Sequence, residues 1–506
     1  MPGLRGVVED LSSVGERLAG YREERWAERL RGLVESVLGV QAEAERVPVY
    51  YWRVGSVEVD PPPRFAVAAP YASGDVEARW AWVEGDPGEW RSWRGFPEGR
   101  VAVARMPGDP DDLKAAALHA WEAGASALVL ESPVPRKIVG VGCWGYSWHA
   151  GEPLPIPVAV VGEGWHSRLP SNGRVRVAVE AEEGYGWGYN IIAREGGPPR
   201  IAFGAHHDGW FTGVQDNLLG IAQALAAARE ALERGAGGVE VILFTAEEHG
   251  APGPAGWYWA WGSRWHARQL EASNIDGVSV YVNFDLAGGG RLHVSGAPQR
   301  VGRALEALKA AGVEAGVRGW ECPECDSLSL AMAGVETVSI HSLWAPGVRG
   351  YYHTPLDTVE RVDWRAAEAA VEAAVRSAMA SPDYGRLETA LHELLAPGPL
   401  EARMILYEIL SAARRHGWQR LYPEMAKRHL RPLHMGDYRL DGPAEMEACM
   451  FPEVCGLRDE RIGEVRAVIV PGEERLLYRP RGRLGDQVRS LLDDLLWRVR
   501  GWLREL

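Results

Sequence analysis

The sequence predicts an α/β protein built on a doubly wound, mostly parallel sheet, with an inserted β-rich segment and a helical C-terminal region. Three observations predict this class. Apolar, strand-like runs alternate with helical patterns from about residue 189 to 380, which is the order of a parallel sheet with crossover helices. Short β-rich runs dominate residues 64–183. Beyond about residue 381, apolar residues recur at helical spacing.

The N-terminal residues 9–46 show apolar positions at helical spacing and are expected to form helix, followed by a β-like stretch over residues 47–59. The run Asp60-Pro61-Pro62-Pro63 then ends any regular element and indicates a boundary. The expected domains are a core of residues 1–61 and 186–380, an insert of residues 62–185, and a helical C-terminal domain of residues 381–506.

Within the core, strands and helices are expected to alternate. The expected strands cover residues 200–205, 239–245, 277–284 and 335–340. The expected helices cover residues 217–232 and 301–311, with a further helix in the insert at residues 112–123. A last apolar stripe over residues 484–503 predicts a helix that packs within the subunit or between two subunits. In a doubly wound sheet the ligand site lies at the carboxyl ends of the strands.

Composition excludes several classes of protein. Hydrophobic residues make up 46% and charged residues 25% of the 506-residue chain, so extensive disorder is excluded. The net charge of −14 argues against nucleic-acid binding, which needs a basic surface. Uncharged stretches are too short to span a membrane, and Glu9 and Asp10 stand where a secretory signal would be apolar. We therefore expect a cytoplasmic protein without nucleic-acid or membrane partners.

Two compositional biases bear on stability and redox state. Lysine accounts for only four of the 55 basic residues, and with 33 prolines this bias is typical of a thermophile. Five cysteines do not form a secreted disulfide framework. Cys322 with Cys325, and Cys449 with Cys455, are candidate disulfide pairs that the sequence leaves open.

Residues of metal-binding type follow the expected core strands. They are His206 with Asp208, Asp216 in the next loop, Glu247 with Glu248, Asp285, and His353 in the last loop. Several carboxylates converging on one rim without a cation would repel one another, and a pair of divalent metals removes that repulsion. Imidazole and carboxylate without thiolate suit Zn²⁺, with Co²⁺ or Mn²⁺ as alternatives. Two such ions need a shared ligand, and a carboxylate can bridge them.

Four segments resemble the co-catalytic zinc aminopeptidase family of metallopeptidase clan MH. In sequence order they are GAHHDGWFTGVQDNLLG, FTAEEHG, NFDLAG and YYHTPLDTVE. That family includes secreted bacterial leucine aminopeptidases, glutamate carboxypeptidase and the transferrin receptor. The resemblance covers about residues 189–380. Residues 99–133, followed by IPVAVVGEGW, resemble a protease-associated domain, a small β-rich module inserted in several peptidase families.

The family resemblance implies a ligand set with two zinc ions per chain. His206 and Asp285 are implied to hold one zinc, and Glu248 and His353 the other. Asp216 is implied to bridge the two ions.

The same resemblance implies the catalytic roles. Asp208 corresponds to the carboxylate that orients the His206 imidazole. Glu247 corresponds to the general base, which takes a proton from the water bridging the zinc ions and passes it to the leaving amine. Tyr352, next to the ligand His353, is expected to contact the substrate.

The function expected on these grounds is a metal-dependent exopeptidase that removes N-terminal residues from short peptides. The main alternative is a glutamate carboxypeptidase-like peptidase, but residues 335–342 lack the arginines that such an enzyme uses on a late core strand. A complete ligand set argues against a non-catalytic transferrin receptor-like binding protein and against a one-zinc glutaminyl cyclase. A homodimer formed through the region after Ser381 is also expected.

Overall fold

The computed structural model describes most of the first 428 residues. The described residues are 3–137 apart from 89, 108–115, 118 and 122; 156–251; 260–273; 277–318; 321–428 apart from 323, 344, 398 and 399; 439–440; and 467–468. The expected helix at residues 484–503, the pair Cys449 and Cys455, and part of the expected helix at residues 112–123 lie outside these ranges.

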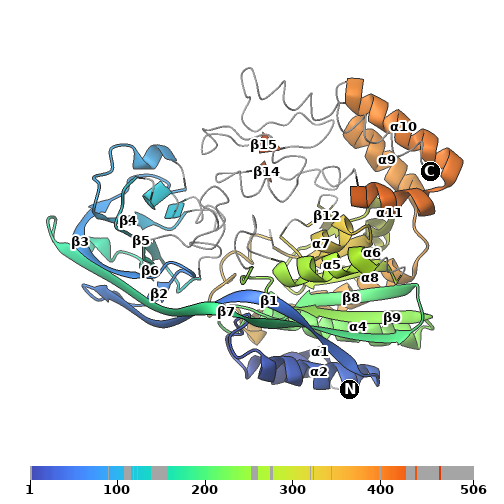
Figure 1. Ribbon diagram of the computed structural model, residues 1–506, viewed down its shortest axis with the longest axis horizontal. Coiled ribbons are helices and arrows are strands. Elements are labelled where there is room, and N and C mark those ends of the chain that lie inside the picture. Colours follow the sequence, from blue (N-terminus) through green and yellow to red (C-terminus); the bar gives the residue numbers. More distant parts are fainter. Residues whose placement is uncertain are drawn as a thin grey trace.

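One large sheet runs through both the core and the insert (Figure 1). In the core its order is β12-β11-β13-β10-β8-β9-β7, and β1 pairs with β7. The pairs β9–β8, β8–β10 and β10–β13 are parallel, which confirms the predicted doubly wound, mostly parallel sheet. The bounds are β1 (Ala42–Asp60), β7 (Arg174–Gly196), β8 (Arg200–His206), β9 (Gly238–Phe244), β10 (Val278–Asp285), β11 (Leu292–Gly296), β12 (Ala315–Val317) and β13 (Glu336–His341).

Helices cover both faces of the core sheet because successive side chains of a strand point to opposite faces. Ile191 packs into a hydrophobic core formed with α1 (Leu4–Ser12), α2 (Glu24–Leu38), α4 (Leu219–Glu233), α6 (Pro298–Ala310) and α8 (Trp364–Met379). The next residue, Ile192, belongs to a second cluster with Leu270 and Leu330, from α5 (Trp261–Ser273) and α7 (Ser327–Met332). The apolar runs in the sequence are therefore strands buried on both faces.

The insert forms the other end of the sheet and has hydrophobic clusters of its own. Its strands are β2 (Ala66–Ala68), β3 (Gly74–Trp82), β4 (Val101–Arg105), β5 (Ala127–Ser132) and β6 (Val158–Gly162). The long antiparallel strands β1 and β7 form a ribbon that extends from the core into the insert (Figure 1). β1 ends at Asp60, directly before the three prolines. The domain boundaries and the kinship with a protease-associated domain stay predictions.

The described C-terminal region is helical. It consists of α9 (Tyr384–Leu395), α10 (Leu400–His416) and α11 (Trp418–Arg428), which share a separate hydrophobic cluster. Two short strands, β14 (Arg439–Leu440) and β15 (Ala467–Val468), pair with each other. Among the described helices, none combines the length and the apolar character needed to cross a membrane.

The expectation of helix over residues 9–46 is wrong in part. Helix α1 ends at Ser12, α2 begins only at Glu24 and ends at Leu38, and β1 already starts at Ala42. The interruptions coincide with Gly15, Gly20 and Gly39, which adopt positive φ angles that favour glycine.

The irregular segment between α1 and α2 ends in a buried acid. Glu23 accepts hydrogen bonds from the amides of Gly20, at 2.6 Å, and Tyr189, at 2.9 Å. Burial raises the pKa of Glu23 to about 8, despite these hydrogen bonds. The folded state therefore holds the Glu23 proton more tightly than the unfolded chain, in which a glutamate titrates near ~4.3.

This difference predicts a pH-dependent contribution to stability. The contribution of Glu23 is fully present below about pH 4.3 and is lost as pH rises through about 8. Between pH 6 and pH 9 the loss in the free energy of unfolding is on the order of 2–3 kcal/mol. Glu23→Gln has no proton to lose, so its urea midpoint should fall less than that of the wild type. Glu28→Gln, at an exposed position of α2, is the control, and equal pH responses of all three proteins would contradict a protonated Glu23.

Candidate metal centre

The five residues predicted as metal ligands lie together at the carboxyl ends of the core strands. His206 is the last residue of β8, and Asp285 is the last residue of β10. Glu248 follows β9, and His353 lies in the loop after β13. Asp216 lies in the kinked segment Val214–Leu218 before α4 and has non-helical backbone angles. All five side chains are buried.

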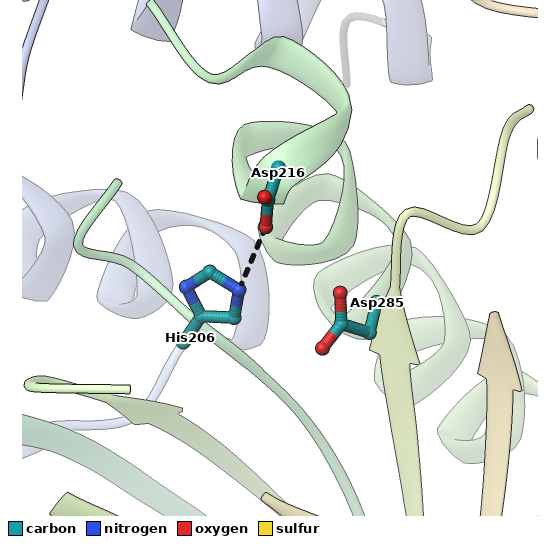
Figure 2. Close-up of side chains that lie close together, drawn as sticks. All are labelled: His206, Asp216 and Asp285. Atoms are coloured by element: carbon teal, nitrogen blue, oxygen red, sulfur yellow. Dashed lines mark ion pairs between the residues drawn. The ribbon is translucent and has the colours of Figure 1, made fainter. Parts of the chain in front are cut away.

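These side chains form two overlapping groups. His206, Asp216 and Asp285 offer ligand atoms within 4.8 Å of one another, and so do Asp216, Glu248 and His353. Figure 2 shows the first group, in which Nε2 of His206 lies 3.1 Å from Oδ1 of Asp216. In the second group, Nε2 of His353 lies 3.1 Å from Oδ2 of Asp216 and 3.1 Å from Oε2 of Glu248. Asp216 therefore directs one oxygen to each group.

The donor atoms fit a pair of zinc ions. Four atoms of the site are buried and make no hydrogen bond with any residue that the structure describes. They are Nε2 of His206 and of His353, Oδ2 of Asp216 and Oε1 of Glu248. Buried polar atoms nearly always have a partner, and a cation is a partner for a lone pair. Imidazole nitrogen and carboxylate oxygen are zinc ligands.

The repulsion between the buried carboxylates also favours a bound cation. Burial, together with the neighbouring negative charge of Asp216, raises the pKa of Glu248 to about 7, although His353 acts in the opposite direction. Burial also raises the pKa of Asp285 well above its usual range, with Asp216 and Asp326 as repelling neighbours. A divalent cation between these carboxylates would remove the repulsion and favour their ionised forms.

Asp208 contacts both the imidazole of His206 and the backbone of Glu247 and Glu248. Nδ1 of His206 lies 3.1 Å from the main-chain oxygen of Asp208 and 3.6 Å from its carboxylate, so the main-chain oxygen takes the hydrogen bond expected for the side chain. The carboxylate instead accepts hydrogen bonds from the amides of Glu247 and Glu248, both at 3.1 Å. Asp208 therefore fixes the turn that presents these two acids, a role that the sequence did not indicate.

Glu247 lies beside the two ligand groups without belonging to either. Its Oε2 is 3.8 Å from Nε2 of His206. Burial, together with the nearby carboxylates of Asp285 and Glu248, raises the pKa of Glu247 well above its usual range. Such a carboxylate is a stronger base than an exposed one.

The remaining predicted features have these positions. Tyr352 is half-buried, and its ring stacks on that of His353 with 3.6 Å between centroids. Cys322 and Cys325 form a disulfide directly before the buried Asp326, whose pKa is raised to about 7 by burial.

Asp357 supports the candidate metal centre, and sequence analysis missed it. Its carboxylate accepts hydrogen bonds from the amide of Gln215, at 3.0 Å to each oxygen, and from the amide of Asp216, at 3.1 Å. It therefore holds the backbone of the shared ligand. The available signal was its place within YYHTPLDTVE, four residues after His353.

Arg17 is a second missed residue. It is buried and donates to the carbonyl oxygens of His207, Thr212 and Gly213, all in the loop between His206 and Asp216. Burial lowers its pKa to about 10, so Arg17 remains a cation at neutral pH, attracted by Asp208 and Asp216. Nothing in the sequence connects a residue before α2 with a loop about 190 residues later.

Comparison with known proteins assigns the region that contains this site. Residues 190–378 match the model of peptidase family M28. This part of the chain is similar to peptidase family M28. The expected enzyme class, a hydrolase acting on peptide bonds, is thereby confirmed, and all five predicted ligands lie within the M28 region.

Several solved structures have a similar fold. A zinc aminopeptidase from Bacillus subtilis, BSAP, is 18% identical, with a TM-score of 0.57 over 74% of this chain and 93% of its own. An M28 peptidase precursor from Shewanella amazonensis is 21% identical, with a TM-score of 0.58 over 76% and 94%. An aminopeptidase from Aneurinibacillus sp. strain AM-1 is 21% identical, with a TM-score of 0.50 over 75% and 94%. A search of curated proteins gave no match.

The contacts of Asp357 predict its effect on metal binding. Asp357→Ala removes the acceptor of the Gln215 and Asp216 amides, so the shared ligand loses its fixed orientation. Residues that orient metal ligands typically contribute about 10- to 100-fold to metal affinity, and we expect a loss of that size in zinc titrations.

Asp363→Ala is the matched control for this prediction. Its carboxylate also accepts a backbone hydrogen bond, from Ala366, but at the start of α8. This variant should lose about 1 kcal/mol of stability and keep its zinc affinity. Equal zinc affinities of the two variants would contradict the role of Asp357.

Proposed function

We propose that this protein is an aminopeptidase that uses two zinc ions to remove N-terminal residues from short peptides. The observation that carries the proposal is the shared carboxylate: Asp216 directs one oxygen toward His206 and the other toward His353. The zinc aminopeptidases of similar fold support it. The cytoplasmic location, the homodimer and the origin in a thermophile remain proposals from the sequence.

The residues have distinct tasks in this mechanism. His206 and Asp285 would hold one zinc, Glu248 and His353 the other, and Asp216 both. Bound there, the zinc pair would supply Lewis-acid activation of a water molecule. Glu247 would take a proton from a water molecule in the site and deliver it to the amine of the departing peptide, since its carboxylate lies 3.8 Å from Nε2 of His206 and belongs to neither ligand group.

The charges around the site support recognition of a substrate amine. Carboxylates surround the proposed metal positions, and they attract the positive α-amine of a peptide. A carboxypeptidase instead needs a free cation for the terminal carboxylate, usually arginine. Three buried basic side chains near the site, those of Arg17, Arg136 and Lys137, bind carbonyl oxygens or the carboxylate of Glu16. These three groups are therefore not available as a carboxylate clamp.

The shared ligand predicts a distinctive pattern of metal loss. The wild type should bind about two zinc ions per chain, and chelation should abolish activity. His206→Ala should keep the zinc ion held by Glu248 and His353, whereas Asp216→Ala should weaken the binding of both ions. Equilibrium dialysis with metal analysis measures the stoichiometry. Full activity after complete metal removal would contradict the proposal.

Glu247→Gln should keep both zinc ions and the fold, because Glu247 belongs to neither ligand group. The amide cannot accept the proton, so kcat should fall by roughly 10² to 10⁴. Glu233→Gln, at an exposed position of α4, is the control and should leave kcat unchanged. If Glu247→Gln turned over at the wild-type rate, Glu247 would have no part in the mechanism.

The end of the substrate that is recognised can be tested directly. An aminoacyl chromogenic amide should be cleaved much faster than its N-acetylated form, because acetylation removes the positive charge that the carboxylates attract. A dipeptide and its C-terminal amide form the complementary pair, and they should react at similar rates. Faster cleavage of the acetylated compound, or dependence on a free C-terminal carboxylate, would favour a carboxypeptidase.

A further inference from the structure

The segment that follows β5 in the insert contacts the loop that carries His353. The guanidinium of Arg136 donates to the main-chain oxygens of Tyr352 and Arg349. The amide of Lys137 donates to the main-chain oxygen of His353, at 3.0 Å. Two adjacent residues of the insert thus make three hydrogen bonds to residues 349–353 of the core, one of them to the proposed ligand itself.

Lys137 also fixes this segment against other parts of the site. Its ammonium group is 3.5 Å from the carboxylate of Glu16 and 5.3 Å from the ring centroids of Trp52 and Trp210. Trp210 lies in the loop between His206 and Asp216. Only 5% of Lys137 is exposed, so this side chain is a fixed point of the structure.

The ligand loop needs such support because of its backbone conformation. His353 has a φ angle of 54°, in the left-handed region that non-glycine residues rarely occupy. A residue keeps this conformation only where its surroundings enforce it. The hydrogen bonds from Lys137 to His353 and from Arg136 to Tyr352 restrain both sides of that position.

We propose that Arg136 is a positioning residue of the metal centre, through which the insert fixes His353 and so completes the half of the centre formed by Glu248 and His353. This inference rests on the proposed two-zinc function. The planar guanidinium suits the task because it binds two carbonyl oxygens in a fixed geometry, and a lysine ammonium does not. Arg136 is buried and both of its terminal nitrogens donate to the loop, so we assign it a role in positioning the ligand rather than in binding the substrate.

The proposal predicts a selective loss of zinc affinity. In titrations against a competing chelator, Arg136→Ala should lower the affinity for one of the two zinc ions by about 10- to 100-fold and leave the other unchanged. Arg136→Lys keeps the charge but not the paired geometry, and should give a smaller loss at the same ion. Arg105→Ala, at an exposed position at the end of β4 in the same insert, is the matched control and should bind both ions as the wild type does.

A second background separates positioning from general destabilisation. His353→Ala should bind only the zinc ion of the His206 group, and adding Arg136→Ala to it should not change the affinity for that ion. Thermal unfolding and circular dichroism establish whether each variant is folded. If Arg136→Ala does not fold, the selective loss in Arg136→Lys decides the proposal.

The outcomes distinguish this inference from the proposed function. A wild-type protein that binds fewer than two zinc ions would overturn the two-zinc centre, and this inference with it. This inference alone would be overturned if the wild type bound two zinc ions and the Arg136 variant bound both with wild-type affinity. It would also be overturned if the variant lost affinity for both ions to the same extent.

Discussion

The candidate metal centre depends on one constraint, the burial of several carboxylates on a single rim of the sheet. Asp216, Glu248 and Asp285 are buried within reach of two imidazoles, and burial raises the pKa of Glu248 and Asp285. Such a cluster is stable as an ionised set only with compensating positive charge. The arrangement of Asp216, one oxygen toward each imidazole, fits two cations in adjacent positions.

Much of the surrounding structure holds these groups at their positions. Asp208 binds the amides of Glu247 and Glu248, and Asp357 binds the amide of Asp216. Arg17 fixes the loop between His206 and Asp216 by its carbonyl oxygens and adds a permanent positive charge nearby. In each case a buried charged side chain binds the main chain next to a ligand, so the ligand side chains remain available for metal.

The architecture also connects regions that are distant in the sequence. The ribbon of β1 and β7 belongs to the core at one end and to the insert at the other. From the insert, Arg136 and Lys137 return to the loop of His353. The N-terminal segment reaches the same area through Glu16, which pairs with Lys137. The site is thus assembled from the core, the insert and the N-terminal segment.

The sequence by itself determined the sheet and the groups at its rim. Apolar runs buried on both faces mark parallel strands, and acids and histidines placed directly after those runs must meet at one edge. It also placed Glu247, Glu248 and His353 by local motifs. Only the tertiary structure decided which buried charges support them: Arg17, Asp357 and Arg136 act through main-chain carbonyls and amides far along the chain. Any residue supplies those backbone groups, so the contacts of Arg17 and Arg136 leave no pattern in the sequence, and Asp357 is marked only by its place within YYHTPLDTVE.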